Sequence, residues 1–539
     1  MEFHTAAPPT SGLTPYSGVF SENEIIHLLR RTMFGAKKQD IVYFLGKNLT
    51  QVVNELLNPV APLPAPPLKD YTVPTTVTTP DNNINLGQTW VNDPNNDGGI
   101  NSLRRASFKK WWVEVMINQD RSIREKITLF WHNHFATATA DIGNSQFVYK
   151  HHSMLRANAL GNFKTLTKAV TIDPAMLVFL NGQYNTATAP DENYGRELQE
   201  LFCCGKGPNS LYTEADVKAA AKVLTGWQNN ATTISSLFTS SRHDSTNKQF
   251  SSFYNNTLIT GRTGATAGDT EIDALLTMIF STDEVAKYIC RRIYRWFVYY
   301  DIDDTIENNI ITPLANILRT NNYEIKPVLS TLLQSQHFFD TLNRGCIIKS
   351  PVDLVIGMSR ELNLPFQPLT DYITNYGYYN YYISWLTAMQ QDIGDPPDVS
   401  GWKAYYQAPQ FYEIWINSDT LPKRNQFTDI MIVSGYTFNG KKLIIDATEY
   451  FKLLSNPANP NTLISDACKY LLAVDISAAS KAQIKTDILL GGQTNDAYWS
   501  DAWNKFISTP TDTANAATVK NRARDLIKYL MDLPEYQLS

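Results

Sequence analysis

The sequence has little charge, few cysteines and no long apolar run. Charged residues make up 18 % of its 539 positions, against roughly 25 % in ordinary globular proteins. The 47 Lys and Arg are spread out, and the net charge is −5, so no basic footprint for nucleic acid is visible. No apolar run approaches the roughly 18 residues of a membrane span. Residues 1–18 lack the basic end and apolar stretch of a signal peptide.

The five cysteines are too few and too scattered to indicate a disulfide framework or a zinc site. Cys203 and Cys204 are adjacent, and a bridge between neighbours would be strained. No Cys-x-x-Cys spacing occurs, so we expect buried free thiols. The sequence also lacks G-x-S-x-G, Walker, G-x-G-x-x-G and H-E-x-x-H motifs, which argues against the familiar serine-hydrolase, nucleotide-binding and zincin classes.

Apolar and aromatic residues are plentiful. Hydrophobic residues reach 43 % and aromatics 12 %, with 28 Tyr, so a large core can form. A surplus of rings also suits contacts with a polymer, a sugar or another protein. The dense run from Tyr372 to Trp385 is either such a binding surface or the core-facing side of a Tyr-rich helix.

The apolar periodicity predicts a mainly α fold: one large helical body with long irregular insertions and at most a small β-hairpin. Ser21, Ser122 and Thr213 each begin a capping box, which marks a helix start. One helix is expected over 41–57, and irregular structure with the small hairpin over 229–268. We expect four parts: an N-terminal arm and helices at 1–57, a Pro/Thr/Asn-rich loop or linker at 58–99, a central helical region at 100–345 with the candidate site, and a C-terminal helical region at 346–539.

His134 lies on the apolar stripe of a predicted amphipathic helix, whereas His132 points about 200° away from it on the same helix. His134 is therefore expected to face inward, either as a core histidine or as a buried ligand or acid/base group. Asn193, Glu197 and Glu200 share a second helix face that Arg196 flanks. That face is either a solvated stripe or a place that binds a metal or holds a proton.

His243 and Asp244 follow in a polar loop. Together these residues predict a mixed nitrogen and oxygen site for a divalent metal ion. His134, Glu200 and His243 would be ligands, and Glu197 a ligand or the general base. Asp244 would orient His243 and Arg196 would stabilise negative charge.

A separate loop contains Asp93, Asn95 and Asp97 in the pattern D-x-[DN]-x-[DN]-G, which begins a calcium loop. Its twelfth position is Arg104 in place of the bidentate Glu. A weaker calcium loop and an Asn/Gly-rich turn without metal both fit this pattern.

Several strings together resemble the bacterial family catalogued as domain of unknown function 1800, over nearly the whole chain. The strings are HLLRRTMFG (27–35), FWHNHF (130–135), DPAML (173–177), NYGRELQELF (193–202), YTEADV (212–217), LTGW (224–227), HD (243–244), KSP (349–351) and PPDVSGW (396–402). The motif positions include His27 and the six candidate residues above. Cys203 and Cys204 depart from the smaller or aliphatic residues usual after Glu200.

The resemblance implies a mainly helical protein without a settled activity. Such proteins are often encoded beside an exported member of the sulfatase and alkaline-phosphatase superfamily, which favours a periplasmic or cell-surface task on a glycan or other polymer. Two hypotheses follow. One is a metal-assisted hydrolase acting on an extracellular polymer or ester. The alternative is a non-catalytic assembly or binding protein that works with the sulfatase-like partner, in which His27, His134 and Glu197 form buried polar networks.

Overall fold

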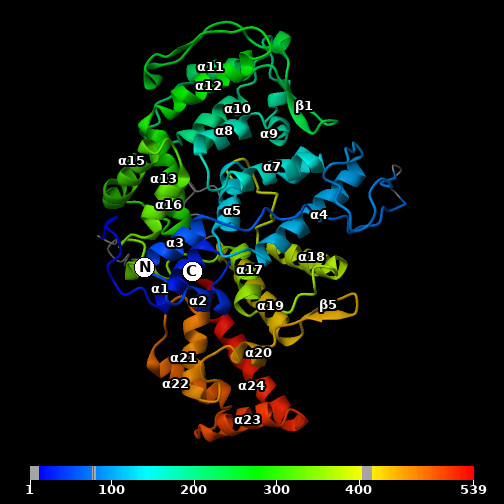
Figure 1. Ribbon diagram of the computed structural model, residues 1–539, viewed down its shortest axis with the longest axis vertical. Coiled ribbons are helices and arrows are strands. Elements are labelled where there is room, and N and C mark those ends of the chain that lie inside the picture. The colour runs from blue at the N-terminus through cyan, green and yellow to red at the C-terminus, as the bar shows by residue number, and fades with distance from the viewer. Residues whose placement is uncertain (1–10, 76, 78–79, 403–414) are drawn as a thin grey trace.

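A computed structural model describes residues 11–75, 77, 80–402 and 415–539. The molecule is elongated, and the chain runs from its centre to an upper lobe, back to the centre, and into a lower lobe (Figure 1). The first central helices are α1 (Glu22–Thr32), α2 (Lys38–Phe44), α3 (Leu49–Leu57), α4 (Gly98–Ile117), α5 (Arg124–His134), α6 (Thr139–Ile142) and α7 (Ser145–Ala157).

The upper lobe and the left side of Figure 1 are built from the next helices. They are α8 (Phe163–Thr171), α9 (Pro174–Phe179), α10 (Asn193–Glu197), the π-helix η2 (Leu198–Cys203), α11 (Glu214–Val223), α12 (Ala267–Phe280), α13 (Asp283–Phe297), α14 (Asp304–Ile306), the π-helix η5 (Glu307–Ile311), α15 (Thr312–Thr320) and α16 (Ile325–Leu333).

The chain then returns to the centre and continues downward. The remaining helices are α17 (Pro351–Glu361), α18 (Tyr372–Ala388), α19 (Thr420–Val433), α20 (Ala447–Phe451), α21 (Pro460–Leu471), α22 (Ala478–Ile484), the π-helix η8 (Lys485–Leu489), α23 (Ala497–Ser508), α24 (Thr513–Asp532) and the 3₁₀-helix η9 (Pro534–Gln537).

Three small antiparallel hairpins complete the described part of the chain. They pair β1 (Trp227–Asn230) with β2 (Ser235–Phe238), β3 (Lys248–Gln249) with β4 (Leu258–Ile259), and β5 (Tyr436–Phe438) with β6 (Lys441–Leu443). The mainly α prediction is confirmed, with more hairpins than the one expected. The last hairpin turns at Asn439 and Gly440, both with positive φ, which is the Asn-Gly signal of a tight hairpin turn.

The capping boxes at Ser21 and Thr213 are present. The box at Ser122 is not, because α5 begins two residues later and Glu125 accepts hydrogen bonds from Arg156, one of them from Nε at 2.9 Å. The helix predicted over 41–57 is also wrong. The segment is divided into α2 and α3 near Gly46, because the φ of 87° at this residue is incompatible with a right-handed helix.

A single contiguous apolar cluster extends from Ile25 to Tyr536, so the described helices form one body. The 58–99 segment lies against α4, where Trp111 Nε1 donates to Ala65 O at 2.6 Å and Ser107 Oγ to Leu68 O at 2.6 Å. The segment therefore follows the surface of this body. The four-part division stays a prediction, and residues 1–10 of the predicted arm lie outside the described residues.

Gly35 explains how α1 meets α17. Its φ is 74°, and a Cβ placed on it would lie 3.0 Å from Gly357 Cα. Only glycine combines a positive φ with so close an approach of two backbones. This contact ties the first helix of the chain to the centre of the molecule.

Most of the Tyr-rich run belongs to the core. Tyr376, Tyr378, Tyr379 and Tyr382 are at most 2 % exposed, and α18 packs on α4. The core-packing interpretation is therefore the right one for these four rings. All five cysteines are free, with Cys346 partly exposed and the other four buried.

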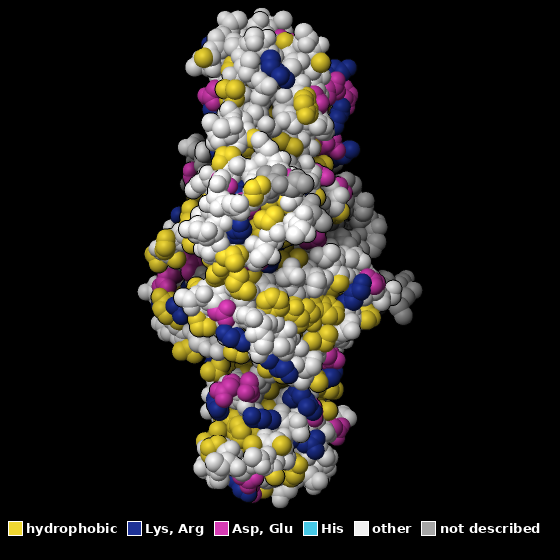
Figure 2. Space-filling view, turned by 90° about the vertical axis from the view of Figure 1, so that its right-hand side faces the viewer, with side chains coloured by type: hydrophobic (Ala, Val, Ile, Leu, Met, Phe, Trp, Pro, Cys, Tyr) yellow, Lys and Arg dark blue, Asp and Glu magenta, His cyan; other side chains and the backbone are white. Residues whose placement is uncertain are grey.

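On the face shown in Figure 2, apolar side chains gather around the middle of the molecule, and side chains of both charges are interspersed above and below them. None of the helices in the described ranges combines the length and the apolar character that crossing a membrane requires.

Candidate functional site

The helix that carries Glu197 and Glu200 changes its winding between them. It is α-helical to Glu197 and π-helical from Leu198 to Cys203, with Cys204 N donating to Gln199 O at 2.8 Å. Single π-turns inside helices occur frequently at functional sites. Both glutamates remain half-buried on the outer side, as the sequence predicted.

Three side chains fix the carbonyls of this winding from the core side. Gln199 Nε2 donates to Gly195 O at 2.9 Å, Tyr288 Oη to Leu201 O at 2.8 Å, and His134 Nε2 to Phe202 O at 3.0 Å. Because buried carbonyls need donors, these bonds stabilise the π-helical backbone. They therefore hold the two glutamates in a fixed position.

Glu197 has the protonation behaviour of an acid/base group. Burial raises the pKa of its carboxyl to about 7, and the neighbouring Glu200 carboxylate raises it further in the same direction. Asp398, from the 396–402 motif, adds a smaller contribution of the same sign, whereas Arg196 and Lys206 oppose it. A carboxyl group that titrates near neutral pH can both accept and release a proton there.

Arg196 and Glu200 are occupied by ion pairs. Arg196 Nη1 and Nη2 lie 2.6 Å and 2.7 Å from the two carboxylate oxygens of Glu214, which raises the pKa of the Arg196 guanidinium. Glu200 Oε1 lies 2.9 Å from Lys206 Nζ. Arg196 is thus a bidentate partner of Glu214, and Glu200 is the ion-pair partner of Lys206.

His134 is buried among aromatic rings, as the inward-facing prediction required. Its ring is 2 % exposed and stacks on Phe130, with Phe202 and Tyr288 nearby. Burial lowers the pKa of His134 far below its ordinary value, and Arg292 lowers it further. The neutral ring donates from Nε2, because a carbonyl can only accept. His134 therefore positions the π-helix.

His243 belongs to a second buried network. Its Nδ1 lies 3.0 Å from Thr225 O, and its Nε2 lies 3.1 Å from Glu271 Oε1. Lys248 Nζ donates to Glu271 Oε2 at 2.6 Å. Burial alone would raise the pKa of Glu271, but the bonds from His243 and Lys248 bring it below its usual value.

Asp244 does not orient His243 in this arrangement. Its Oδ1 accepts from Thr246 N at 2.8 Å, which makes it a turn residue, and Glu271 takes the place predicted for it beside His243. Sequence reasoning missed Glu271 and Lys248, because they lie on different elements and join only in the tertiary structure. Lys248 binds both Asp244 and Glu271, and no local pattern in the sequence indicated the bond to Glu271.

The predicted mixed metal site is not assembled in the described part of the chain. Within residues 11–402 and 415–539, apart from the short gaps at 76 and 78–79, no three His, Cys, Asp or Glu side chains lie together as metal ligands do. His134 and His243 face different protein partners, Phe202 and Glu271. A divalent metal held by His134, Glu200 and His243 stays a prediction that would require these contacts to exchange.

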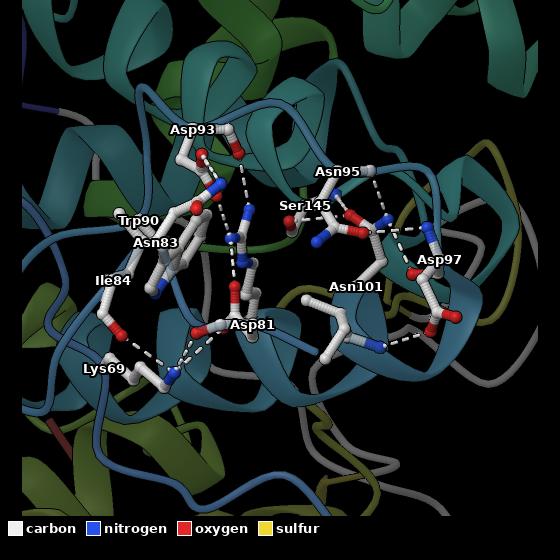
Figure 3. Close-up of polar contacts among 12 residues, drawn as sticks. Lys69, Asp81, Asn83, Ile84, Trp90, Asp93, Asn95, Asp97, Asn101 and Ser145 are labelled. Carbon is white, nitrogen blue, oxygen red and sulfur yellow. Dashed lines mark hydrogen bonds and ion pairs between the residues drawn. The ribbon is translucent and has the colours of Figure 1, made fainter. Parts of the chain in front are cut away.

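The predicted calcium loop directs its oxygens to separate protein partners (Figure 3). Asp93 Oδ2 accepts from Arg104 at 2.7 Å, Asn95 Oδ1 accepts from Asp97 N at 2.8 Å, and Asp97 Oδ1 caps α4 by accepting from Ile100 N at 3.0 Å. Arg104, at the twelfth position, donates to Asp93 and brings a positive charge where a calcium loop has a carboxylate. Calcium binding by this loop stays a prediction.

The same Arg104, on α4, also binds an earlier part of the 58–99 segment, in which the loop lies. Its Nη2 also lies 2.7 Å from Asp81 Oδ1, and Asp81 lies 3.3 Å from Lys69 Nζ. Figure 3 shows Lys69, Asp81 and Asp93 on the left and, on the right near the start of α4, Asn95, Asp97 and Asn101. The loop therefore serves to fasten the segment to the helix.

Comparison with known proteins assigns the family. The model of the family described as "Protein of unknown function (DUF1800)" matches residues 27–538. The chain belongs to the DUF1800 family. Searches among curated proteins and among solved structures found no match.

Two motifs of this DUF1800 chain meet beside the π-helix. Trp402 N, in the 396–402 motif, donates to Asn133 Oδ1 at 2.8 Å, next to His134 in the 130–135 motif. Gly401 has a φ of 94°, and a Cβ there would collide with Asn133. The contact also places Asp398 where it acts on the Glu197 carboxyl.

The DUF1800 chain also buries histidines outside the predicted metal site. Burial lowers the pKa of His132 to about 3 and that of His152 far below its ordinary value. His151 Nδ1 lies 3.0 Å from Asp173 Oδ1. The His151-His152 pair in a chain with eight His was the available signal. His27 is buried too, with Nε2 3.0 Å from Phe338 O.

Proposed function

We propose that this DUF1800 protein is a hydrolase in which Glu197 transfers protons, acting on a glycan polymer or an ester. The observation that carries the proposal is the Glu197 carboxyl. It is half-buried beside Glu200, directly before the π-helix, and its pKa is about 7. A group with this pKa is divided between its acid and base forms at neutral pH, which is the condition for efficient acid–base catalysis.

The proposed reaction assigns one role to each glutamate. On an ester, ionised Glu197 removes a proton from water as the water oxygen attacks the acyl carbon, and its conjugate acid returns that proton to the leaving oxygen when the tetrahedral intermediate collapses. On a glycan, where the attacking water and the leaving oxygen lie on opposite faces of the sugar, Glu197 serves as the base and the leaving oxygen takes its proton from solvent. Glu200 pairs with Lys206 Nζ at 2.9 Å, and its charge raises the pKa of Glu197.

The acid–base form has fewer requirements than the metal-assisted form. His134 and His243 would each have to give up a buried protein partner, Phe202 O and Glu271, to bind an ion. Glu197 and Glu200 can act without such exchange. A polymeric or ester substrate and a periplasmic or cell-surface setting are carried over from the family resemblance alone, as is the alternative of an assembly protein that works with a sulfatase-like partner.

Hydrolysis of chromogenic substrates tests the proposal. Aryl glycosides, carboxylate esters, phosphate esters and sulfate esters are assayed with wild type, Glu197→Gln and the control Glu449→Gln, whose side chain is 64 % exposed on α20. We expect kcat/KM to rise with pH through about 7, and Glu197→Gln to lower it by about 10²–10⁴-fold. The control should match wild type.

Two results would contradict the proposal. One is activity that Glu197→Gln retains in full with its pH profile unchanged. The other is the absence of hydrolysis of all four substrate classes by folded wild type, which would shift support to the assembly or binding alternative.

A further inference from the structure

A cluster of charged side chains is enclosed where the centre of the molecule joins the lower lobe. It gathers residues from α1, α17, α19, α20 and η9 and from the start of the 349–351 motif, near the middle of Figure 1. Their exposed fractions are 6 % for Arg30, 4 % for Lys349, 3 % for Glu361, 0 % for Arg424, 3 % for Tyr450 and 0 % for Tyr536.

The charges of this enclosure are paired at long range only. Arg30 Nε lies 3.9 Å from Glu361 Oε1, and Lys349 Nζ lies 3.9 Å from Glu361 Oε2. Both separations exceed the roughly 2.7–3.2 Å of a hydrogen bond. Lys349 Nζ also lies 4.0 Å from the centre of the Tyr536 ring. Neither cation therefore forms a hydrogen-bonded ion pair with Glu361.

Five buried polar atoms of the enclosure have no hydrogen-bond partner among the residues the structure describes. They are Arg30 Nε, Arg424 Nη1, the Tyr450 and Tyr536 hydroxyls, and Glu361 Oε2. Buried polar atoms in native proteins are nearly always satisfied by protein, water or a bound group. Five such atoms in one enclosure therefore indicate a bound group.

Contacts join most of these side chains into one cluster: Arg30 and Lys349 flank Glu361, Lys349 lies over the Tyr536 ring, and Arg424 Nη2 donates to Lys349 O at 3.0 Å. Burial lowers the pKa of Lys349 to about 8; Glu361 opposes this, and Arg30 and Arg424 add to it. Burial raises the pKa of Tyr536, and its neighbours include Glu361, Tyr450, Arg30 and Arg424.

The chemistry of the enclosure favours a negative ligand. Arg30, Lys349 and Arg424 face one buried carboxylate, Glu361. Of the five unpartnered atoms, the two arginine nitrogens only donate, the two tyrosine hydroxyls can donate or accept, and Glu361 Oε2 accepts. The nearby Asp353 is engaged elsewhere, by Lys126 and by Ser350 Oγ at 2.9 Å. Because uncompensated buried charge is strongly unfavourable, an ion that only accepts hydrogen bonds would balance both charge and donors.

Arg30 also connects the enclosure with the surface. It lines a pocket of about 390 Å³ together with Arg344 and Lys469. Its Nη1 and Nη2 donate to Leu472 O at 2.6 Å and Tyr470 O at 2.9 Å, so Arg30 contributes both to the pocket and to the buried cluster.

We propose that the enclosure binds one small inorganic anion of chloride size, held by Arg30, Arg424, Lys349 and the two tyrosine hydroxyls. The anion joins the N-terminal helix, the centre and the C-terminal end of the described chain. The site is independent of Glu197 and of the hydrolase proposal.

Bromide substitution and chloride titration test this site. Crystals grown with bromide in place of chloride should show an anomalous peak within hydrogen-bond distance of Arg424 Nη1 and a tyrosine hydroxyl. In solution, the Tm of wild type should rise saturably as sodium chloride replaces sodium gluconate at constant ionic strength. Removing one donor by Tyr536→Phe should raise the half-saturating chloride concentration by about tenfold or more.

A matched control and a second variant keep the test decisive. Tyr294→Phe removes the hydroxyl of another fully buried tyrosine, which bonds His337 at 3.0 Å outside the enclosure, and should keep the wild-type chloride response. Tyr450→Phe replaces Tyr536→Phe if that variant fails to fold. An enclosure filled by water alone without a bromide peak, or the same chloride response in wild type and the enclosure variant, would overturn the proposal.

Discussion

Replacing His134 by Phe separates a positioning role of this residue from a catalytic or metal-binding one. The aromatic surroundings accept a phenyl ring, but the buried carbonyl of Phe202 loses its donor, which lies at 3.0 Å. An unsatisfied buried acceptor destabilises a protein by about 1–3 kcal/mol. We therefore expect His134→Phe to lower the free energy of unfolding by about that amount at pH 7.5.

The difference in the free energy of unfolding between wild type and His134→Phe should depend on pH, and the size of this dependence can be calculated more closely. Burial keeps His134 neutral in the folded state, with its pKa far below the ordinary value, whereas the unfolded chain takes up a proton below about pH 6.5. Its contribution is complete above that pH and is lost as the pH falls toward the folded pKa. At about pH 5.5 wild type has lost about 1.4 kcal/mol through this one group, and the variant has not.

Urea denaturation at pH 7.5 and at about pH 5.5 measures the loss of the hydrogen bond and the effect of His134 protonation. The destabilisation by His134→Phe should shrink by about 1.4 kcal/mol on acidification. His134→Gln keeps an N–H donor without an ionisable ring, so its loss at pH 7.5 should be smaller. A difference that stays constant or grows on acidification would refute the neutral, positioning role, as would stoichiometric loss of a bound metal ion from His134→Phe.

Two further substitutions test the other buried networks. Glu271→Gln leaves the Lys248 ammonium, which is 1 % exposed, with only the more distant Asp244 Oδ1 at 3.9 Å and should lower the free energy of unfolding by about 3 kcal/mol. Restoration of most of that loss in a double variant with Lys248→Met, measured by urea denaturation, checks the pairing. Arg104→Met removes the cation at 2.7 Å from Asp81 but leaves Lys69 Nζ at 3.3 Å, and should destabilise by less, about 1–3 kcal/mol. Because Arg104 occupies the twelfth position of the predicted calcium loop, addition of calcium or EGTA should leave the wild-type Tm unchanged, and a calcium-dependent rise would instead support a metal in that loop.

Local patterns in the sequence determined which segments are helices and which residues face inward. The capping boxes at Ser21 and Thr213 and the apolar stripe with His134 involve residues within one or two turns of each other. Such contacts form whatever the remainder of the chain does. The family match likewise follows from ordered short motifs.

Local patterns were insufficient where a distant residue competes for the same side chain. Glu125 was expected to complete a capping box but pairs with Arg156, 31 residues away. His243 was expected beside Asp244 but meets Glu271, 28 positions along the chain. Buried charges select whichever partner satisfies them in the folded core, and spacing along the chain carries no information about that choice.

The sequence thus determined the helical class, the inward position of His134 and the shared face of Glu197 and Glu200. Only the tertiary structure decided that burial and Glu200 together bring the pKa of Glu197 to about 7, and that Arg30, Lys349, Arg424 and Glu361 form one enclosure. The physical reason is that a pKa and a buried charge balance depend on desolvation and on neighbours in space.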